Sequence, residues 1–476
     1  MKELESLDRY SHKSAGYLKG VNNLVFYLFL ISFIIIVNIF GYSFINIREI
    51  KYLFIVNILL VFVFYFKLFG KYWHPIFIFL GTLTLFQGGL IIFGDYDDYS
   101  YVWLMGANFS LTETAIRLTF LLISLSYWFT LIGGYFGKKS IVKDKNFSIY
   151  SNHFLNRIKF FFLIIYFLTL PFYVYKQLNY FSFFLKYGYI AFYQTSDYLE
   201  QVGYIPRAIS FITPLAFLCF FLLERKKKNI LFISLPFFII TLSLLFSGFR
   251  GSFFTFWLTF LLFYKQKFNN HISYKSLFVL ISIISIFGLM ISLFREGIQI
   301  NLIDIFNNNP IFLFFKQQGV SYYVTAMAIE FRHEFAPRIF HYLVIEPFLA
   351  IFTKLGGTPG NSFATDLMIK INYDGFLHGY GVGSTYLAEA YLLGGIPFAC
   401  FFSFVLGFLI SRLFSYFEYT TIFNKLIIFT FMQYIAFLPR DLLFMPLAQT
   451  VKVAFYLPFL YVILSLVAEL FKGVNE

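Results

Sequence analysis

Two arginines stand where one apolar run of the sequence ends or the next begins, and a guanidinium group there could bind an anion. Arg250 lies in the segment Ser247–Ser252, whose two glycines permit a tight turn. The N–H groups at the start of the following helix would add positive charge to that of Arg250. Arg295 stands beside Glu296 at the end of a later apolar run. The alternative for both arginines is an anchor that holds a helix end at a membrane surface.

A third arginine, Arg440, follows Pro439 and precedes Asp441. The proline would end the helix before it, so Arg440 is expected in a turn. A guanidinium group binds phosphate through two parallel N–H groups. We therefore predict that Arg250, Arg295 and Arg440 converge on one anionic group such as a phosphate.

The glycine-rich segment 379–395 is the fourth candidate. Glu389 is expected within the first turns of a membrane helix, where a buried carboxylate costs about 2.5–3.5 kcal/mol. Such a residue faces a polar cavity or forms a structural ion pair. Ser384 could contact a ligand or cap the helix. His378, just before this segment, is a candidate general base, although a histidine in a loop is also often only solvated.

The elements that position these residues are apolar runs of the length that crosses a membrane, about 20 residues. Twelve such runs are predicted: Leu24–Ile45, Tyr52–Gly70, Pro75–Gly94, Ala115–Phe136, Ile158–Tyr175, Ile205–Leu223, Asn229–Gly248, Phe249–Tyr264, Leu277–Phe294, Thr385–Ser411, Thr421–Leu438 and Val451–Phe471. The run Phe249–Tyr264 is short, so it could be tilted, broken or re-entrant. The chain is 59% hydrophobic and only 13% charged, whereas soluble domains carry about 25% charged residues. We expect a single transmembrane domain over residues 1–476, with an all-α polytopic fold.

Lysines and arginines gather in the loops of one side, for example in Arg225–Lys228 and at Lys265 and Lys267. This bias predicts that both termini are cytoplasmic. It also explains the net charge of +13 without nucleic-acid binding. On the outer side, we expect residues 295–384 to form one large loop between the ninth and tenth helices, and Lys176–Tyr204 to form a smaller one.

The chain resembles the bacterial O-antigen polymerases of the Wzy type. The residues that carry the resemblance lie in four places: Ser247–Gly251, Phe294–Glu296, Gly381–Tyr391 followed by Gly394 and Gly395, and Pro439–Asp441. Their order, their side of the membrane and the long late outer loop are also similar to that family.

The resemblance implies a membrane glycosyltransferase related to the GT-C class, in the inner membrane of a bacterium. It would join oligosaccharide units linked to undecaprenyl pyrophosphate at the periplasmic face, with inversion and without a metal or other cofactor. Arg250, Arg295 and Arg440 would hold the pyrophosphate, and His378 or Glu389 would act as the base. Five further residues would line the substrate site: Gly251, Gly383, Ser384, Tyr386 and Asp441. The expected partners are donor and acceptor glycan lipids, the bilayer and a chain-length regulator.

Two other functions of the same general layout stay open. An O-antigen ligase would have a similar outer loop and often a histidine close to the start of the late helix. A flippase for lipid-linked oligosaccharides would also have about twelve helices, but it would carry charges along a central path in mid-membrane.

Overall fold

Most of the chain is helical in the computed structural model, which describes residues 27, 29–70, 74–104, 107–139, 152–188, 191, 201–246, 250–268, 310–345, 362–378 and 380–455. Seven described helices are long and apolar enough to cross a membrane: Ile50–Phe69, Pro75–Phe93, Glu113–Lys138, Asn156–Tyr187, Tyr204–Leu223, Lys227–Leu245 and Tyr386–Tyr419. Two shorter apolar helices are Phe29–Phe44 and Ile422–Ile435. The predicted ninth span lies outside the described residues, as does the twelfth beyond residue 455. An α-helical membrane protein is confirmed, whereas the count of twelve remains a prediction.

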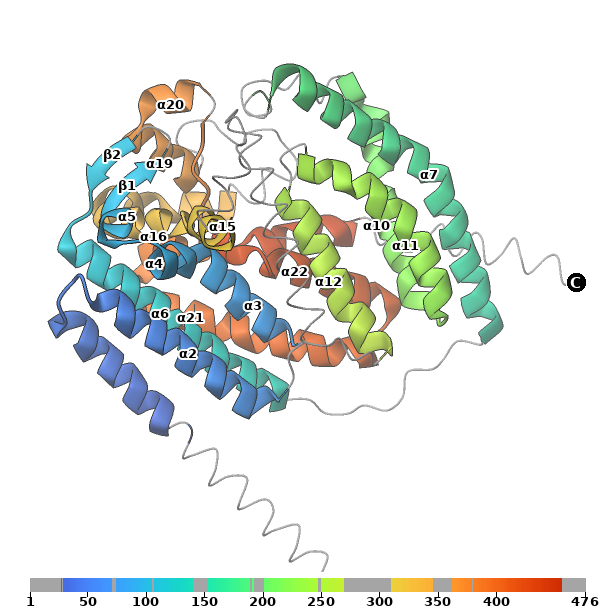
Figure 1. Cartoon of the computed structure of the whole chain (residues 1–476). Coiled ribbons are helices and arrows are strands. Elements are labelled where there is room, and N and C mark those ends of the chain that lie inside the picture. Colours follow the sequence, from blue (N-terminus) through green and yellow to red (C-terminus); the bar gives the residue numbers. More distant parts are fainter. Residues whose placement is uncertain are drawn as a thin grey trace, which may run out of the picture.

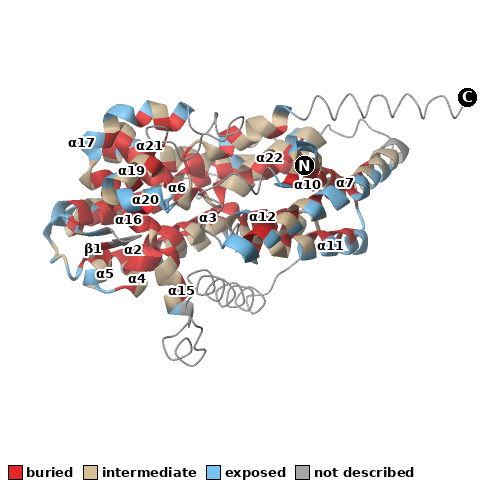
Figure 2. Ribbon diagram, turned by 90° about the horizontal axis from the view of Figure 1, so that it is seen from above, coloured by how far each residue is buried: buried red, intermediate tan, exposed pale blue. Residues whose placement is uncertain are grey.

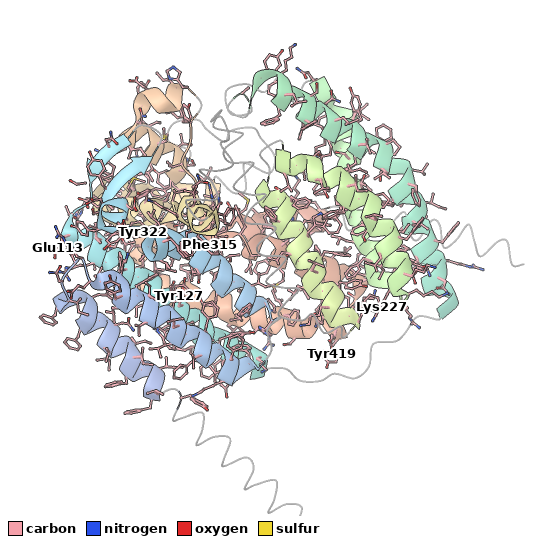
Figure 3. The ribbon with its side chains drawn as sticks, in the orientation of Figure 1. Glu113, Tyr127, Lys227, Phe315, Tyr322 and Tyr419 are labelled. Atoms are coloured by element: carbon pink, nitrogen blue, oxygen red, sulfur yellow. The ribbon has the colours of Figure 1, made fainter. Side chains whose placement is uncertain are left out.

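The helices form two groups with one helix between them (Figure 1). The first group contains α2 (Ile50–Phe69), α3 (Pro75–Leu83), α6 (Glu113–Lys139) and α21 (Tyr386–Tyr416). The second contains α7 (Asn152–Tyr187), α10 (Tyr204–Leu223), α11 (Lys227–Phe246) and α12 (Arg250–Phe268). Helix α22 (Ile422–Ile435) lies between the two groups and ends near the candidate site. Lys227 and Tyr419 lie toward the same end of the molecule (Figure 3), which agrees with the prediction that their loops share one side.

Small residues let α6 and α21 touch backbone to backbone. A Cβ atom added at Gly133 would lie 2.0 Å from the carbonyl oxygen of Phe404, and one at Gly407 would lie 2.1 Å from that of Thr130. Gly137 makes a third contact of this kind. Because lipid removes the hydrophobic drive between membrane helices, such close van der Waals packing is what holds them together.

Helix α21 is not the single straight span that Thr385–Ser411 predicted. Gly394 and Gly395 have non-helical dihedral angles, and φ of +71° with ψ of −158° at Gly395 is a conformation almost restricted to glycine. The hydroxyl of Tyr386 lies 3.4 Å from that of Ser403. In a straight helix these residues, 17 positions apart, would be separated by about 25 Å along the axis. Residues 386–393 therefore fold back against residues 396–416 as a helical hairpin.

Two other predicted segments differ from the observed helices. Helix α7 continues to Tyr187, past the predicted end at Tyr175, so the expected smaller outer loop begins about three turns later. Its sequence holds Pro171 but no glycine before residue 188, and membrane helices tolerate a proline inside them. The predicted third span is confirmed, but it is interrupted by a π-helical turn, η1 (Thr84–Gly88), before α4 (Gly89–Phe93). The eighth run forms one continuous helix, α12.

The described part of the predicted outer loop folds into short helices. They are α15 (Pro310–Gln318), α16 (Ser321–Glu330), α17 (Arg332–Phe335), η2 (Ala336–Arg338), η3 (His341–Ile345), α19 (Phe363–Ile371) and α20 (Tyr373–Leu377). Residues 321–329 of α16 are all buried, and the ribbon near the α16 label in Figure 2 is red, the colour of buried residues. Part of the predicted loop is therefore core. The sequence did not predict this, because α16 shows no separate apolar and polar faces. Such a helix can be core when protein surrounds it on all sides.

A small two-stranded ribbon is the one departure from the all-α prediction among the described residues. It pairs β1 (Tyr101–Leu104) with β2 (Ala107–Ser110) in antiparallel register, just before α6. Lys316 of α15 forms an ion pair of 2.7 Å with Asp98, which lies in the short helix α5 (Tyr96–Ser100) before the ribbon. The loop helices are thus tied to the end of the bundle where α6 begins.

We expect Gly407→Ala to destabilise the protein, because the new methyl group would force the backbones of α6 and α21 apart. Overpacking of this kind typically costs about 1–3 kcal/mol. Gly81→Ala in α3 is the matched control, since nothing lies within 4 Å of its added Cβ atom. Thermal unfolding of the purified chain in detergent measures both. Equal melting temperatures for the two variants would contradict the close packing.

Candidate functional site

The candidate site is built on the turn that follows α22, residues 438–443. Its first part is the 3₁₀ turn η5 (Leu438–Arg440), whose second residue is Pro439. The completely buried carboxylate of Glu389 holds this turn from the side. One of its oxygens accepts a hydrogen bond from the backbone N–H of Leu443 at 2.7 Å, and the other accepts one from the hydroxyl of Ser384 at 2.6 Å. Glu389 thereby joins the loop before α21 to the turn that carries Arg440.

A second buried network reaches the same turn from η1. The Gln87 amide donates to the carbonyl of Pro439 at 2.8 Å and accepts from the Thr325 hydroxyl at 3.0 Å. Thr325 also lies 3.0 Å from the hydroxyl of Thr385. The π-helical turn of η1 displaces Gln87 from the regular helical face, a feature often found at functional sites. These hydrogen bonds therefore join four segments that are distant in sequence.

Arg440 is held at the edge of this network. Its guanidinium donates to the Gln318 side chain at 3.1 Å and lies over the ring of Phe86, with 5.6 Å between the charge centre and the ring centroid. The Arg440 side chain is partly exposed, whereas Gln318 and Phe86 are buried. These contacts fix the direction of the guanidinium, and the residue keeps part of its surface exposed. Figure 3 shows Phe315 of α15 and Tyr322 of α16 near this end of the bundle.

The start of α12 lies against the same turn. A Cβ atom added at Gly251 would come within 3.0 Å of the ring of Phe437, three residues before Arg440. Arg250 is the first residue of α12, so its backbone lies at the site, but its side chain is outside the described part of the structure. Arg295 is also outside the described residues. The structure thus brings two of the three predicted arginine positions to one place.

The other predicted residues are spread over different positions. Gly383 lies beside the turn, because its added Cβ would be 3.8 Å from the carbonyl oxygen of Arg440. Tyr386 is completely buried, and its ring packs near that of Phe79, so it supports the bundle behind the site in this conformation. His378 is exposed, and Nδ1 of its ring lies 2.7 Å from the carbonyl oxygen of Asp374 in its own short helix.

Of the two alternatives for Ser384, the cap of the late helix is excluded, because the neighbouring residue takes that place. Thr385 is the N-cap of α21 and accepts a hydrogen bond from the N–H of Ala388 at 3.0 Å. Ser384 turns the other way and donates to Glu389. The carboxylate is the stronger acceptor in a buried site, which decides the direction of the serine hydroxyl.

Asp441 completes the turn with a second carboxylate. Its Oδ1 accepts a hydrogen bond from the N–H of Leu442 at 2.8 Å. The side chain is partly exposed, yet protein atoms surround the carboxyl closely, and this desolvation raises the pKa of Asp441 to about 7. A carboxyl group with this pKa can exchange a proton near neutral pH.

Sequence reasoning missed three residues of the site: Gln87, Gln318 and Thr325. Gln87 had a visible signal, since it is an amide within the apolar run Pro75–Gly94, and a polar side chain in a membrane span usually has a partner. Gln318 and Thr325 had no such signal, because they fall in the segment 295–384, which was predicted to be a loop.

Fold and site together define a multi-pass helical membrane protein with a buried polar turn that presents an arginine and a carboxyl group. A sequence model described as O-antigen polysaccharide polymerase Wzy matches residues 23–473. The chain belongs to this family of bacterial membrane glycosyltransferases, which polymerise O antigen. No curated protein and no solved structure matches it.

We expect Glu389→Gln to loosen the 438–443 turn. An amide keeps one oxygen acceptor for the N–H of Leu443, and its NH₂ then meets the oxygen of Ser384, so the Ser384 hydroxyl loses the carboxylate that accepts its hydrogen. A buried donor left unpaired costs about 1–3 kcal/mol. The free energy of unfolding in detergent should fall by that amount, and polymer formation should fall with it.

Glu334→Gln is the control for this change. Glu334 is exposed and pairs with Lys370 at 3.0 Å. Such surface pairs contribute about 0–1 kcal/mol, so stability and polymer should stay near the wild-type level. Equal effects of the two substitutions would show that Glu389 does not hold the turn.

Proposed function

We propose that the chain polymerises oligosaccharide repeat units linked to undecaprenyl pyrophosphate, at the periplasmic face of the inner membrane. The observation that carries this proposal is the meeting of the Arg440 turn with the start of α12, where Arg250 stands. A polymerase that uses such substrates needs a site that stabilises the lipid pyrophosphate as the leaving group. Guanidinium groups fixed at one turn have the charge and geometry for that task. The family match favours a polymerase over a ligase or a flippase.

In the proposed reaction, a hydroxyl of the acceptor sugar attacks the anomeric carbon of the donor glycan. The new carbon–oxygen bond forms as the bond from that carbon to the pyrophosphate oxygen breaks. The electron pair leaves with the lipid pyrophosphate, whose added charge Arg440, Arg250 and Arg295 stabilise. A single displacement of this kind inverts the anomeric configuration, and the arginines supply the positive charge that a divalent cation supplies in other transferases.

The proton of the attacking hydroxyl goes to Asp441 in this mechanism. Glu389 is a poor base, because both of its oxygens accept hydrogen bonds in a fully buried position. His378 is exposed, and its Nδ1 lies against the carbonyl oxygen of Asp374, which leaves Nε2 as an acceptor, so His378 stays the second candidate for the base. Asp441 stands next to Arg440, its Oδ2 has no hydrogen-bond partner among the described residues, and its pKa of about 7 suits a base near neutral pH.

The finer architecture belongs to the same proposal. We propose twelve spans, a GT-C-like arrangement, cytoplasmic termini and a periplasmic position for residues 295–384. Gly251, Gly383 and Ser384 would line the path of the glycan at the turn, and Tyr386 would support it from behind. A chain-length regulator would act as a separate protein partner.

We expect Arg440→Ala to lower polymerisation by about 10²–10³-fold, the usual effect of removing one group that stabilises transition-state charge. Arg440→Lys should restore only part of the activity, because an ammonium group cannot form two parallel hydrogen bonds. Glycan ladders on gels from a deletion strain carrying each variant measure this.

Arg412→Ala is the control, since Arg412 lies over the ring of Phe408 in the last turns of α21, far along the helix from the candidate turn. It should give normal ladders. A deletion strain that makes glycan of one repeat unit supports a polymerase, whereas loss of all attached glycan, or a normal ladder from Arg440→Ala, would overturn the proposal.

The pH dependence tests Asp441. A base must be deprotonated, so the rate should rise as the pH passes through about 7 and level off above it. Asp441→Asn should remove this inflection and lower the rate by about 10²–10⁴-fold. His378→Ala should keep the wild-type profile. The measurement is the initial rate of the purified enzyme on lipid-linked substrate; an inflection that survives in Asp441→Asn would exclude Asp441 as the base.

A further inference from the structure

Helices α7 and α10 carry two cationic residues at the same level. The helices run antiparallel, and the hydroxyls of Thr169 and Thr213 join them at 3.0 Å. Lys176 lies seven residues after Thr169, and Arg207 lies six residues before Thr213. At a rise of about 1.5 Å per residue, both cations stand about 10 Å from that bond, in the same direction.

A third cation comes from the helix that follows the candidate turn. Residues 445–455 are helical, and Lys452 in this helix lies over the ring of Phe211, with 4.9 Å from Nζ to the ring centroid. Phe211 is one turn after Arg207 on α10. Lys452 and Arg207 are also both close enough to Lys176 to repel its charge. Three separate helices thus contribute to one group, the Lys176–Arg207–Lys452 cluster.

The cluster lies between helices rather than on their lipid-facing side. Tyr166, Thr169 and Tyr173 mark the buried face of α7, and Lys176 continues that face. All three cations are partly buried. Among the described residues, which do not include 192–200, none of the three forms an ion pair with a carboxylate. Like charges held together in a poorly solvated place are unfavourable unless an anion joins them.

We propose that the Lys176–Arg207–Lys452 cluster binds the pyrophosphate of the second lipid-linked substrate, the acceptor. The inference rests on the proposed polymerase function. Both substrates carry a lipid pyrophosphate, but the acceptor attacks through a sugar at the far end of its repeat unit, so its pyrophosphate must lie some sugar rings away from the donor's. The helix of residues 445–455 provides that separation, because it leads from the Arg440 turn to Lys452 over about 10 Å.

The test counts binding sites on the full chain in nanodiscs of neutral phosphatidylcholine. Farnesyl pyrophosphate is the probe, with inorganic pyrophosphate and farnesol as parallel arms. Wild-type protein should bind two farnesyl pyrophosphates per chain. The K176Q/R207Q variant should bind one, the Arg440→Ala variant should bind one, and K186Q should bind two. Lys186 is the matched control because it is an exposed lysine on the same helix.

Kinetics then separate the two substrates. In K176Q/R207Q the KM for the acceptor should rise at least tenfold while the KM for the donor stays unchanged. Two sites retained in this variant, or phosphatidylglycerol displacing the probe as well as farnesyl pyrophosphate itself does, would overturn the assignment; the second result would make the cluster an anchor for anionic lipid. A wild-type polymer ladder from Arg440→Ala would instead reject the proposed function, while the loss of one site in K176Q/R207Q would still stand.

Discussion

The buried carboxylate of Glu389 is the interaction on which the site depends. It accepts hydrogen bonds from a hydroxyl on one side and from a backbone N–H of the 438–443 turn on the other. A carboxylate far from water is costly unless donors surround it, so the loop before α21 and the turn after α22 are held in one arrangement. Arg440 is held in position by the hydrogen bond between Glu389 and this turn, and by the one that the Gln87 amide donates to the carbonyl oxygen of Pro439.

The hairpin within α21 explains how a carboxylate can reach that depth. Residues 386–393 do not span the membrane by themselves; they fold back on residues 396–416 at Gly394 and Gly395. Irregular backbone is tolerated in a membrane where protein covers it, and here Gly395 is buried, with the guanidinium of Arg332 of α17 3.7 Å from its added Cβ. The close glycine contacts between α6 and α21 anchor the longer arm, so the short arm can present Glu389 to the turn.

The Arg440 turn and the Lys176–Arg207–Lys452 cluster would have different tasks in the proposed reaction. In the proposed reaction the Arg440 turn would stabilise the charge that develops on the leaving pyrophosphate, and its guanidinium is held in advance by Gln318 and Phe86. The Lys176–Arg207–Lys452 cluster would hold a charge that does not change during the reaction. Groups aimed at developing charge accelerate a reaction, whereas groups that bind a constant charge position the substrate.

The sequence by itself determined that this is a multi-pass membrane protein, where most of the long helices lie, and that Arg440 and Glu389 are candidate site residues. The length of an apolar run and a charge inside or beside it are local properties of the sequence. Only the tertiary structure decided that α21 folds back, that α16 is core, and that Gln87 and Thr325 complete the network. Those features depend on contacts between segments as much as 352 positions apart, as in the bond from Gln87 to Pro439. The roles of His378 and Glu389 were likewise open in the sequence, since a side chain's hydrogen-bond partners are known only when distant parts of the chain are in place.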